Sequence, residues 1–264
     1  MAEQILIRED IGAITRLTLN APGSLNALSD AMLARLKEEF SSLMQDTGQR
    51  VVILRGAGKA FCAGHDLKEL RAKRQEADKG AVAIRDLFDR CAEVMQMIPR
   101  LPQPVIAQVH GIATAAGCQL VASCDLAVAS DETRFGVNGV NIGLFCSTPM
   151  VALSRNVPRK HVFEMLTTGR FIYANRAAEL GLINKSVHSE ALESETMDLA
   201  ETIAAKLGSA VTVGKRAFYE QLELPLNAAY EMTGAVMVEN MQNNDTAEGI
   251  SAFLEKRVPN WSQD

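Results

Sequence analysis

The sequence predicts an α/β protein made of repeated ββα units, with one hydrophobic core and a helical part at its C-terminal end. A strand, a glycine turn and a helix follow one another from Val51 onward and again from Val105 onward, which is typical of parallel strand pairing. From about His161 the pattern becomes mainly helical. The chain has 264 residues, of which 47% are hydrophobic, so it is long enough to bury a sizeable core. We therefore expect a ββα core over residues 1–195 and a helical part over residues 196–264.

The first predicted elements are a hairpin and an amphipathic helix. Short β-type runs at 5–7 and 14–19 flank a turn around Gly12, which is a hairpin signal. Ser29 or Asp30 can cap the helix that follows. The apolar residues of this helix repeat at helical spacing and are Met32, Leu33, Leu36, Phe40 and Leu43.

A charged, alanine-rich segment at 67–97 separates two strands that we expect to be buried. The strands are predicted at 51–54 and 105–109, where apolar β-forming residues follow one another without interruption. The segment between them is helical in character, with a break at 78–80. We interpret its first half as a mobile flap.

The rest of the chain predicts further strands and helices. They are helices at 113–123, 162–166 and 177–180, strands at 125–129 and 183–187, and long helices after Ser189. Asn175 is the expected N-cap of the helix at 177–180, and Gly181 its terminator. Asp245, three residues before Glu248, predicts a capping box that opens a final helix running to about Arg257.

The composition argues against several classes of protein. A net charge of -5 gives no electrostatic footprint for nucleic acid. The longest apolar stretch, 112–129, is interrupted by Gln119 and Asp125, so it reads as a buried helix and strand and not as a membrane span. The chain has five cysteines and no Cys-x-x-Cys pair, so we interpret them as reduced thiols and expect no metal site.

The first residues lack the basic and apolar segments of a secretory signal and the arginine-rich character of an organelle presequence. We therefore expect a cytoplasmic protein, with a processed mitochondrial form as the alternative.

Two glycine-rich bends, at 61–67 and 110–119, are the most informative feature of the chain. In the second bend small residues open a predicted helix, so no bulky side chain blocks the peptide N–H groups, and the helix N-terminus adds positive potential. Backbone donors of this kind can stabilise an oxyanion that develops during a reaction. The pair of bends therefore predicts a site that favours an enolate.

A series of motifs in a fixed order resembles the crotonase superfamily, the enoyl-CoA hydratase/isomerase group. The motifs lie at 25–28 (Leu-Asn-Ala-Leu), 60–70 (Ala-Phe-Cys-Ala-Gly-His-Asp-Leu-Lys-Glu-Leu), 104–107 (Pro-Val-Ile-Ala), 117–118 (Gly-Cys), 124–126 (Cys-Asp-Leu), 135–136 (Phe-Gly), 142–143 (Ile-Gly), 168–170 (Thr-Gly-Arg), 177–184 (Ala-Ala-Glu-Leu-Gly-Leu-Ile-Asn) and 253–257 (Phe-Leu-Glu-Lys-Arg). Each motif alone is weak, but the ordered set covers nearly the whole chain and is highly specific.

The resemblance implies a crotonase-type spiral of ββα units and a C-terminal helical subdomain that forms trimers. The expected assembly is a homotrimer, or a homohexamer built as a dimer of trimers. The expected substrate is an acyl-CoA thioester, so coenzyme A enters as part of the substrate and no cofactor is bound permanently.

The resemblance also implies roles for individual residues. The thioester oxygen would lie between the backbone N–H of His65 and that of Ala116 or Gly117. The residues expected to contact the coenzyme A part are Ala27, Ala63, Asp66, Leu67 and Lys256. Lys59, Lys68 and Arg257 are further candidates for its phosphates, although a solvated surface charge is the usual role of such residues.

The sequence departs from the hydratase pattern at the two positions where these enzymes carry catalytic glutamates. The residues here are Gln119 and Gly139, neither of which can exchange a proton near neutral pH. Hydration by a carboxylate pair is therefore not expected. In this respect the chain is similar to enoyl-CoA-hydratase-domain-containing proteins that lack the hydratase glutamates. Replacing both residues by glutamate would test whether the pocket is intact and lacks only the two catalytic carboxylates.

His65 and Cys146, near the bends, each have two possible roles. A histidine in the first bend resembles methylmalonyl-CoA decarboxylase, but Cys146 stands where that enzyme carries a tyrosine. His65 either transfers a proton or only contacts a backbone carbonyl, and Cys146 is either a reactive thiol or a small buried hydrophobe.

Two hypotheses about function follow from these readings. The first is a lyase or isomerase that acts on acyl-CoA, as in fatty acid metabolism, through enolate stabilisation. The second is a non-catalytic acyl-CoA-binding or regulatory oligomer. A P-loop at 56–59 is excluded, because Ile53 and Ala60 replace the glycine and the hydroxyl residue that this motif requires.

Overall fold

The computed structural model describes residues 4–262, in which one six-stranded sheet forms the centre of the molecule. Its strands lie in the order β1 (Leu6–Ile11), β2 (Ile14–Leu19), β3 (Val51–Gly56), β4 (Val105–Val109), β6 (Leu126–Ser130) and β9 (Lys185–Val187). β1 and β2 pair antiparallel, and every later neighbour pairs parallel. The predicted α/β class with parallel pairing is confirmed, although the first strand extends to Ile11, beyond the predicted run at 5–7.

A smaller sheet lies below the first and was not expected from the sequence. Its strands are β5 (Ile112–Thr114), β7 (Arg134–Gly136) and β8 (Ile172–Tyr173), in that order. The prediction of a helix from residue 113 is wrong at its start, because 112–114 is extended and pairs with β7. The helix, α4 (Ala116–Ser123), begins only after this strand.

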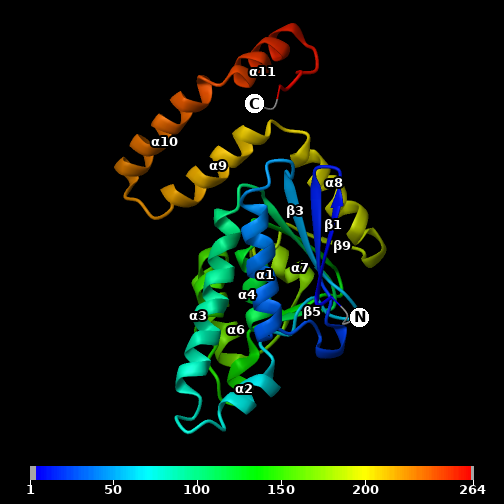
Figure 1. The fold of residues 1–264 in the computed structure, drawn as a ribbon, viewed down its shortest axis with the longest axis vertical. Coiled ribbons are helices and arrows are strands. Elements are labelled where there is room, and N and C mark those ends of the chain that lie inside the picture. Colours follow the sequence, from blue (N-terminus) through cyan, green and yellow to red (C-terminus); the bar gives the residue numbers. More distant parts are fainter. Residues whose placement is uncertain (1–3, 263–264) are drawn as a thin grey trace.

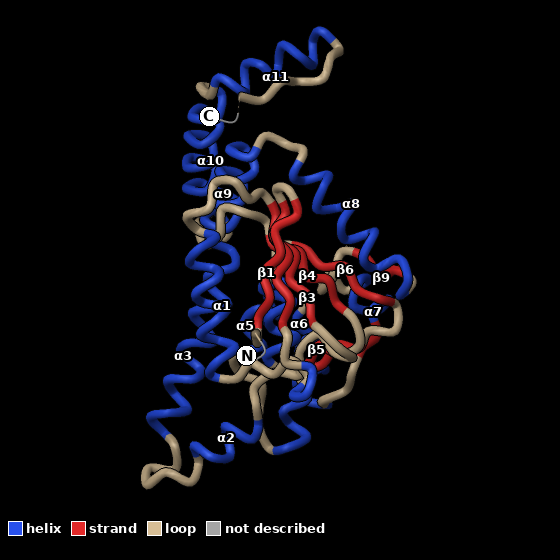
Figure 2. The backbone as a smooth tube through the Cα atoms, turned by 45° about the vertical axis from the view of Figure 1, so that its right-hand side comes forward, coloured by secondary structure: helices blue, strands red, loops and turns tan. Residues whose placement is uncertain are grey.

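Helices cover both faces of the main sheet (Figure 2). α1 (Asp30–Leu43) and α3 (Ala81–Met97) lie on one face with the larger hydrophobic cluster. α8 (Leu192–Ala204) covers the other face with a smaller cluster. The predicted cap of α1 is confirmed, because the Ser29 side chain accepts a hydrogen bond from the Met32 N–H.

Shorter elements connect the strands and the covering helices. They are α2 (Leu67–Lys73), α5 (Pro149–Asn156), α6 (Arg159–Thr168), α7 (Ala174–Glu179) and the 3₁₀ helices η1 (Pro22–Ser24), η2 (Ile98–Arg100), η3 (Asn138–Ile142) and η4 (Ser189–Ala191). The predicted break at 78–80 separates α2 from α3, and Gly80 there has a φ of +77°. The predicted cap by Asn175 is wrong: Tyr173 is the N-cap, because the chain enters α7 directly from β8.

The chain ends in a helical arm that extends away from the sheets (Figure 1). It consists of α9 (Gly208–Gln221), α10 (Leu226–Met241) and α11 (Asn244–Glu255). Asn243, and not Asp245, caps α11, because its side chain accepts from the Asp245 N–H. The predicted capping box is absent from this segment, since Glu248 pairs with Arg257 instead.

The division at residue 195 stays a prediction; the boundary falls inside α8. Within residues 4–262, no helix combines the length and the apolar character needed to cross a membrane.

Candidate functional site

The two glycine-rich bends lie side by side in the fold. Cys62 of the first bend forms a parallel bridge with Ala113 of β5. The Cys62 N–H donates to the Ile112 carbonyl at 3.1 Å, and the Thr114 N–H donates to the Cys62 carbonyl at 3.0 Å. The first bend is held on its other side by the Leu28 N–H, which donates to the Gly64 carbonyl at 2.8 Å. Segments about 50 residues apart are thus joined where the sequence predicted a shared site.

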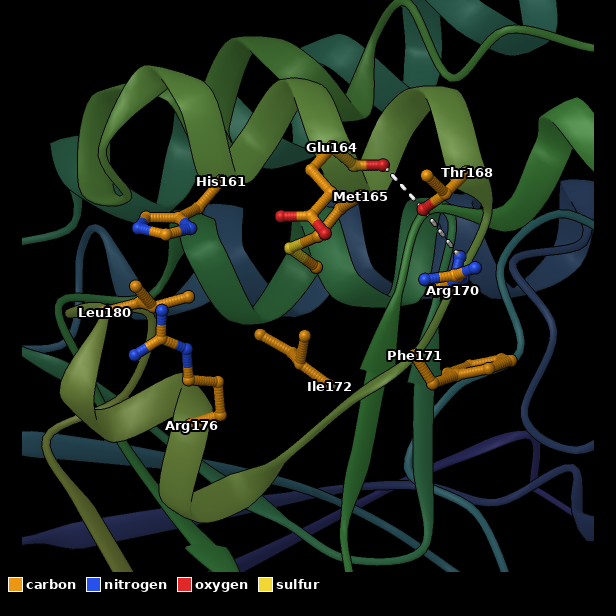
Figure 3. Close-up of a pocket in the computed structure, with 9 residues that line it drawn as sticks. All are labelled: His161, Glu164, Met165, Thr168, Arg170, Phe171, Ile172, Arg176 and Leu180. Carbon is orange, nitrogen blue, oxygen red and sulfur yellow. Dashed lines mark hydrogen bonds between the residues drawn. The ribbon is translucent and has the colours of Figure 1, made fainter.

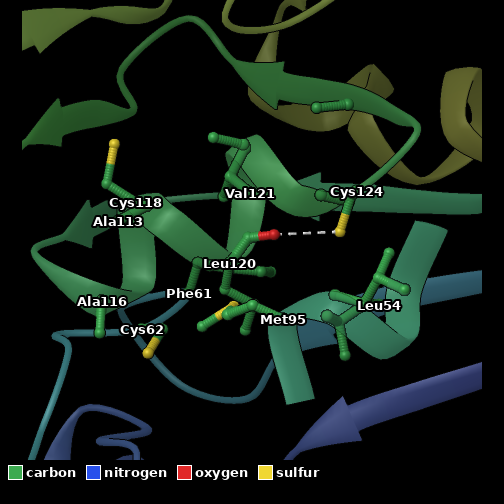
Figure 4. Packing of buried hydrophobic residues seen from close by; sticks show 14 of the residues in the cluster. Leu54, Phe61, Cys62, Met95, Ala113, Ala116, Cys118, Leu120, Val121 and Cys124 are labelled. Carbon is green, nitrogen blue, oxygen red and sulfur yellow. Dashed lines mark hydrogen bonds between the residues drawn. The ribbon is translucent and has the colours of Figure 1, made fainter. Parts of the chain in front are cut away.

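Two glycines make this close approach possible. Gly64 has a φ of +87°, and a Cβ added there would lie 3.2 Å from the Ala116 nitrogen and 3.0 Å from the Thr114 oxygen. A Cβ added at Gly117 would overlap the carbonyl oxygen of Cys62, which lies beside the first turn of α4 (Figure 4). The first turn of α4 is therefore pressed against the first bend, and a side chain at either glycine would push them apart.

The backbone N–H groups predicted to act at the site have no acceptor within residues 4–262. This applies to His65 in the first bend and to Ala116 and Gly117 in the first turn of α4. The first N–H groups of any α-helix lack an intrahelical partner and carry the positive end of the helix dipole. The site therefore offers donors to an anionic oxygen.

The residue before these donors adopts an unusual backbone conformation. Ala115 has a φ of +50° and a ψ of -120°, a combination that an L side chain rarely adopts. Its N–H donates to the Gly136 carbonyl at 2.9 Å, which holds the turn in place. Strain of this kind costs about 1–3 kcal/mol and persists only where the surroundings impose it. The sequence pattern showed only small residues here, so this feature was missed.

The side chain of His65 is enclosed at the first bend. Its Nδ1 lies 3.4 Å from the Leu28 carbonyl oxygen, and its ring meets Phe88 of α3 edge to face at 5.3 Å. A carbonyl only accepts, so Nδ1 carries the proton of the neutral ring and Nε2 has a free lone pair. Nε2 is buried and has no partner. Burial lowers the pKa of His65 below its ordinary value of 6.5, which keeps the ring neutral at pH 7.

Gln119 lies one helical turn after Ala116, on the same face of α4. It is only 5% exposed, and its Oε1 is buried without a hydrogen-bond partner. An unpaired buried acceptor of this type costs about 1–3 kcal/mol.

Gly139 and Cys146 contact each other in the segment that follows β7. A Cβ added at Gly139 would lie 2.6 Å from the Leu144 carbonyl oxygen and 2.8 Å from the Cys146 Sγ. The space that a side chain at position 139 needs is therefore already filled, and the double glutamate replacement suggested by the sequence would disturb this segment. Burial raises the pKa of the Cys146 thiol, so it stays protonated and poorly nucleophilic.

Four of the five residues expected to contact coenzyme A lie at or beside the first bend. Ala27 is buried, Ala63 is half-buried, and Leu67 is 55% exposed. Asp66 caps α2, because its carboxylate accepts from the Lys68 N–H at 2.7 Å. The fifth residue, Lys256, ends α11 on the arm, at the opposite end of the molecule from α2 (Figure 1).

A structural residue of this region was not recognised from the sequence. Asn26 is fully buried with a φ of +54°, and its Nδ2 donates to the carbonyls of Ala57 and Ala60 at 2.8 Å each. Its Oδ1 accepts from the Ala21 N–H at 2.9 Å. The Leu-Asn-Ala-Leu motif thus connects the loop before α1 to the segment that leads into the first bend. No sequence pattern indicated this role of Asn26, because the positive φ and the burial are properties of the folded chain.

Two cavities lie outside this group of residues. One, of about 420 Å³, is lined by Leu25, Lys59, Ala60, Gly111, Ile112, Glu132 and Arg134 and borders the start of the first bend. The other, of about 290 Å³, lies among α6, β8 and α7, with His161, Glu164, Arg170 and Arg176 around an apolar floor (Figure 3). The second contains none of the predicted site residues. Residues 4–262 contain no group of three or more side chains arranged to hold a metal ion.

Comparison with known proteins identifies the family of this chain. The sequence profile of the family described as "Enoyl-CoA hydratase/isomerase" matches residues 9–264. The chain belongs to this family. The superfamily resemblance drawn from the motifs is therefore confirmed.

Relatives and solved structures agree with one another on this assignment. The chain is 44% identical to the mitochondrial enoyl-CoA hydratase domain-containing protein 3 of Danio rerio over 99% of this chain and 89% of that protein. It is 48% identical to the Mus musculus protein of the same name, over 94% and 81%. A crystal structure described as an enoyl-CoA hydratase of Mycobacterium smegmatis superposes with a TM-score of 0.94 at 53% identity, covering 98% of this chain and 99% of that one. The human domain-containing protein 3 superposes with a TM-score of 0.93 at 44% identity, covering 98% and 100%. The crotonase-type fold with its C-terminal helices is thereby confirmed.

Proposed function

We propose that this protein binds an acyl-CoA thioester and stabilises its enolate oxygen between the N–H of His65 and the N–H of Ala116, with Gly117 as the alternative second donor. The observation that carries the proposal is that these donors, from two bends joined by Cys62, have no acceptor within residues 4–262. Removing one donor of an oxyanion hole typically costs about 10²–10³ in rate.

Proton transfer in this proposal is assigned to His65. Its neutral ring presents a free lone pair at Nε2. The imidazole takes a proton from the carbon next to the thioester carbonyl, and the electron pair of that C–H bond moves to the carbonyl oxygen. If the acyl chain carries a double bond between C3 and C4, the enolate is conjugated with it. Return of the proton to C4, with the double bond moving to C2–C3, then completes an isomerisation, and no further reactant is needed. Hydration by two carboxylates is not proposed, because Gln119 and Gly139 carry none.

The second candidate function is acyl-CoA binding without turnover, in a regulatory oligomer. The observations that favour it are the protonated Cys146 thiol and the complete shielding of His65 Nε2 from solvent. In this case the bends would bind the thioester, but no group would move a proton.

We propose that the coenzyme A part binds next to the start of the first bend. Lys59 and Arg134 line the larger cavity beside Leu25 and offer positive charge to phosphates. Lys256 lies on the arm, so in this proposal it reaches a site only across an interface with another copy.

The oligomer and the compartment also remain proposals. We propose a homotrimer or homohexamer formed through the arm, which carries exposed apolar residues such as Phe253. The mitochondrial names of the relatives favour the processed mitochondrial form over the cytoplasmic one. Fractionation of cells that express the native protein would separate the two.

The oxyanion proposal can be tested with two glycine variants. Gly64→Ala places a Cβ 3.2 Å from the Ala116 nitrogen, whereas Gly12→Ala, at a similar positive φ, meets no atom within 4 Å. Infrared spectra of bound butyryl-CoA should show a lowered thioester C=O frequency in the wild type and in Gly12→Ala, and a smaller shift in Gly64→Ala.

The same samples separate the two candidate functions. Exchange of the α-protons of butyryl-CoA in D₂O, followed by NMR, should occur in the wild type and fall by about 10²-fold in Gly64→Ala. A frequency shift without proton exchange would favour the non-catalytic function. Bound thioester with an unshifted carbonyl would refute the oxyanion role.

A further inference from the structure

The ring nitrogen that the proposed function needs is covered in the folded chain. His65 Nε2 is buried and has no hydrogen-bond partner. A thioester that gives its α-proton to this atom must bring the α-carbon to about 3 Å from it. The groups that cover the ring must therefore move aside before the acyl part can enter.

The elements around the ring differ in how firmly they are held. α1, whose preceding Leu28 carbonyl faces Nδ1, contributes five buried apolar residues to the larger cluster. Every residue of α2 is half-buried or exposed, and the buried residues of α3 begin only at Leu87. Phe88, which meets the ring edge to face at 5.3 Å, lies at this border. α2 and the start of α3 are therefore the part of the cover that can move at the lowest cost in buried apolar surface.

One carboxylate joins both of these helices to α1. Asp30, the first residue of α1, accepts from the Lys73 Nζ of α2 and from the Arg90 Nη2 of α3, at 2.6 Å each. The Asp30 backbone N–H donates to the Glu69 carboxylate of α2 at 2.9 Å. The side chains of Lys73 and Arg90 are 17% and 30% exposed, so both ion pairs are partly shielded from water. Arg90 lies next to the part of α3 that covers the ring, so its pair with Asp30 holds that part in place.

We infer that Asp30 is a positioning residue, whose two ion pairs hold α2 and the start of α3 closed over the His65 ring, so that an acyl thioester reaches Nε2 only when both pairs break. The inference rests on the proposed function, which gives the ring its part in proton transfer. Closure of this kind keeps water away from a reacting group, and opening admits the substrate.

Arg90 provides a matched control within the same helix. Its Nε donates at 2.7 Å to Asp86, four residues earlier in α3, whose side chain is 62% exposed. Asp30→Asn and Asp86→Asn each remove one negative charge from the same guanidinium. The first breaks the ion pairs that join three helices, whereas the second breaks an ion pair inside α3.

The test measures access to the His65 ring by its reaction with diethylpyrocarbonate at pH 7.5, with each modified histidine identified by mass spectrometry. Burial lowers the pKa of His65, so the ring is neutral at this pH and the rate reports access. For two partly buried ion pairs we expect modification to be about tenfold faster in Asp30→Asn. Asp30→Glu, which keeps the charge, and Asp86→Asn should stay within about threefold of the wild type. The exposed His188 should react at one rate in every protein compared and serves as the internal standard.

Hydrogen exchange shows where the opening occurs. In Asp30→Asn the amides of α2 and of the start of α3 should exchange faster, while those of the buried strand β3 should keep their wild-type protection. Faster exchange in β3 as well would show that the whole protein is destabilised, and would overturn the role of Asp30.

The remaining outcomes separate this inference from the proposed function. Equal modification of His65 in the wild type and in Asp30→Asn, or an equal acceleration in Asp86→Asn, would overturn the role of Asp30. Neither measurement requires a thioester. Excess butyryl-CoA should protect His65 of the wild type from the reagent. Faster modification in Asp30→Asn without protection by butyryl-CoA would support the closing role of Asp30 and contradict the proposed function.

Discussion

The proposed function assigns two roles to His65: its backbone N–H, which has no acceptor within residues 4–262, binds the oxyanion, and its ring, packed against Phe88, transfers the proton. Burial favours the neutral ring, since a charged imidazolium loses its hydration there. A neutral ring with a free lone pair is the form that a general base needs. The burial that disfavours the charged ring thus keeps His65 in the neutral form that the proposed proton transfer requires.

The pH dependence of this residue can be predicted with its sign. The folded-state pKa of His65 lies below the ordinary value of 6.5, so the neutral form predominates at pH 7 and above. The rate of α-proton exchange should be constant between about pH 7 and 8 and should fall as the pH drops below about 6.5. His65→Gln should lower the rate by about 10²–10⁴ and remove this acid limb.

The control for this variant is His188→Gln, which changes an exposed histidine and should keep the wild-type profile. The free energy of unfolding provides a second readout. Because the unfolded chain binds the proton more readily than the folded one, the stabilisation from a neutral His65 is complete above about pH 6.5 and is lost as the pH falls. An acid limb that persists in His65→Gln would show that another group titrates.

Ala115 and Gly139 show how narrowly single residues are constrained at the site. Ala115 holds a backbone conformation that favours glycine, and the position of the Ala116 N–H depends on it. Gly139 is required by close packing, since Leu144 and Cys146 fill the space next to its Cα. From the sequence alone, Gly139 looks like a position that has lost a catalytic side chain. In the structure, Leu144 and Cys146 occupy the space that such a side chain would need.

At the scale of elements, one buried network joins α9 to the edge of the core. The Lys215 Nζ donates to the carbonyls of Ile98 and Gln103 at 2.8 and 2.9 Å and to the Asp125 carboxylate at 2.7 Å. The Tyr219 hydroxyl donates to the other carboxylate oxygen at 2.8 Å. Asp125 thus connects the start of β6 with the first helix of the arm.

Replacing Lys215 by methionine should strongly destabilise the protein. The variant leaves the Asp125 carboxylate buried without its cation, and such a loss typically lowers the free energy of unfolding by about 3–5 kcal/mol. Burial lowers the pKa of Lys215, which shows that the charged ammonium loses hydration in the folded protein. Methionine avoids this desolvation cost, but the loss of the ion pair and of the hydrogen bonds to the carbonyls has the larger effect on stability. Urea unfolding followed by circular dichroism would measure the change.

Lys37→Met is the matched control, because Lys37 and Glu93 form an ion pair in which both side chains are 48% exposed. Exposed pairs contribute about 0–1 kcal/mol, so this variant should unfold close to the wild type. Equal effects of the two variants would show that the Lys215 network does not anchor α9.

At the scale of the whole molecule, the helical arm extends away from the sheets (Figure 1), and many of its apolar side chains are exposed. The exposed apolar residues of α9, its C-cap, α10 and α11 include Phe218, Leu222, Leu226, Tyr230, Met237, Val238, Met241, Phe253 and Leu254. Exposed apolar side chains that gather on one part of a protein mark sites of association. They support the proposal that copies of this chain pack through their arms.

Self-association can be tested at the end of the arm. Phe253 is 82% exposed, and covering such a side chain stabilises an interface by about 1.5–3 kcal/mol. Light scattering after size exclusion should give a trimer or hexamer for the wild type and a lower average mass for Phe253→Asp at micromolar concentration. Val82→Asp, at a 76% exposed residue of α3 outside the arm, should keep the wild-type mass. A monomeric wild type would contradict the proposal.

Local pattern accounts for the parts of the fold that were predicted correctly. The strands at 51–54 and 105–109 are continuous apolar runs, and the spacing of Leu33, Leu36 and Phe40 repeats with the period of a helix. The errors fall where tertiary pairing overrides such patterns. Residues 113 and 114 were predicted as the start of a helix but lie in β5 and pair with β7. Asn175 was predicted as an N-cap but lies inside α7, because β8 leads directly into that helix.

By itself, the sequence determined the α/β class, the family, the order of the buried elements and the two bends that carry the candidate donors, because these depend on periodicity, glycine positions and motif order along the chain. Only the tertiary structure decided that the bends are joined through Cys62, that Gln119 and His65 keep unpaired buried atoms, and that Cys146 fills the space beside Gly139. These features arise from contacts between residues far apart in the chain, and the free energy of such contacts depends on packing and burial that no local pattern encodes.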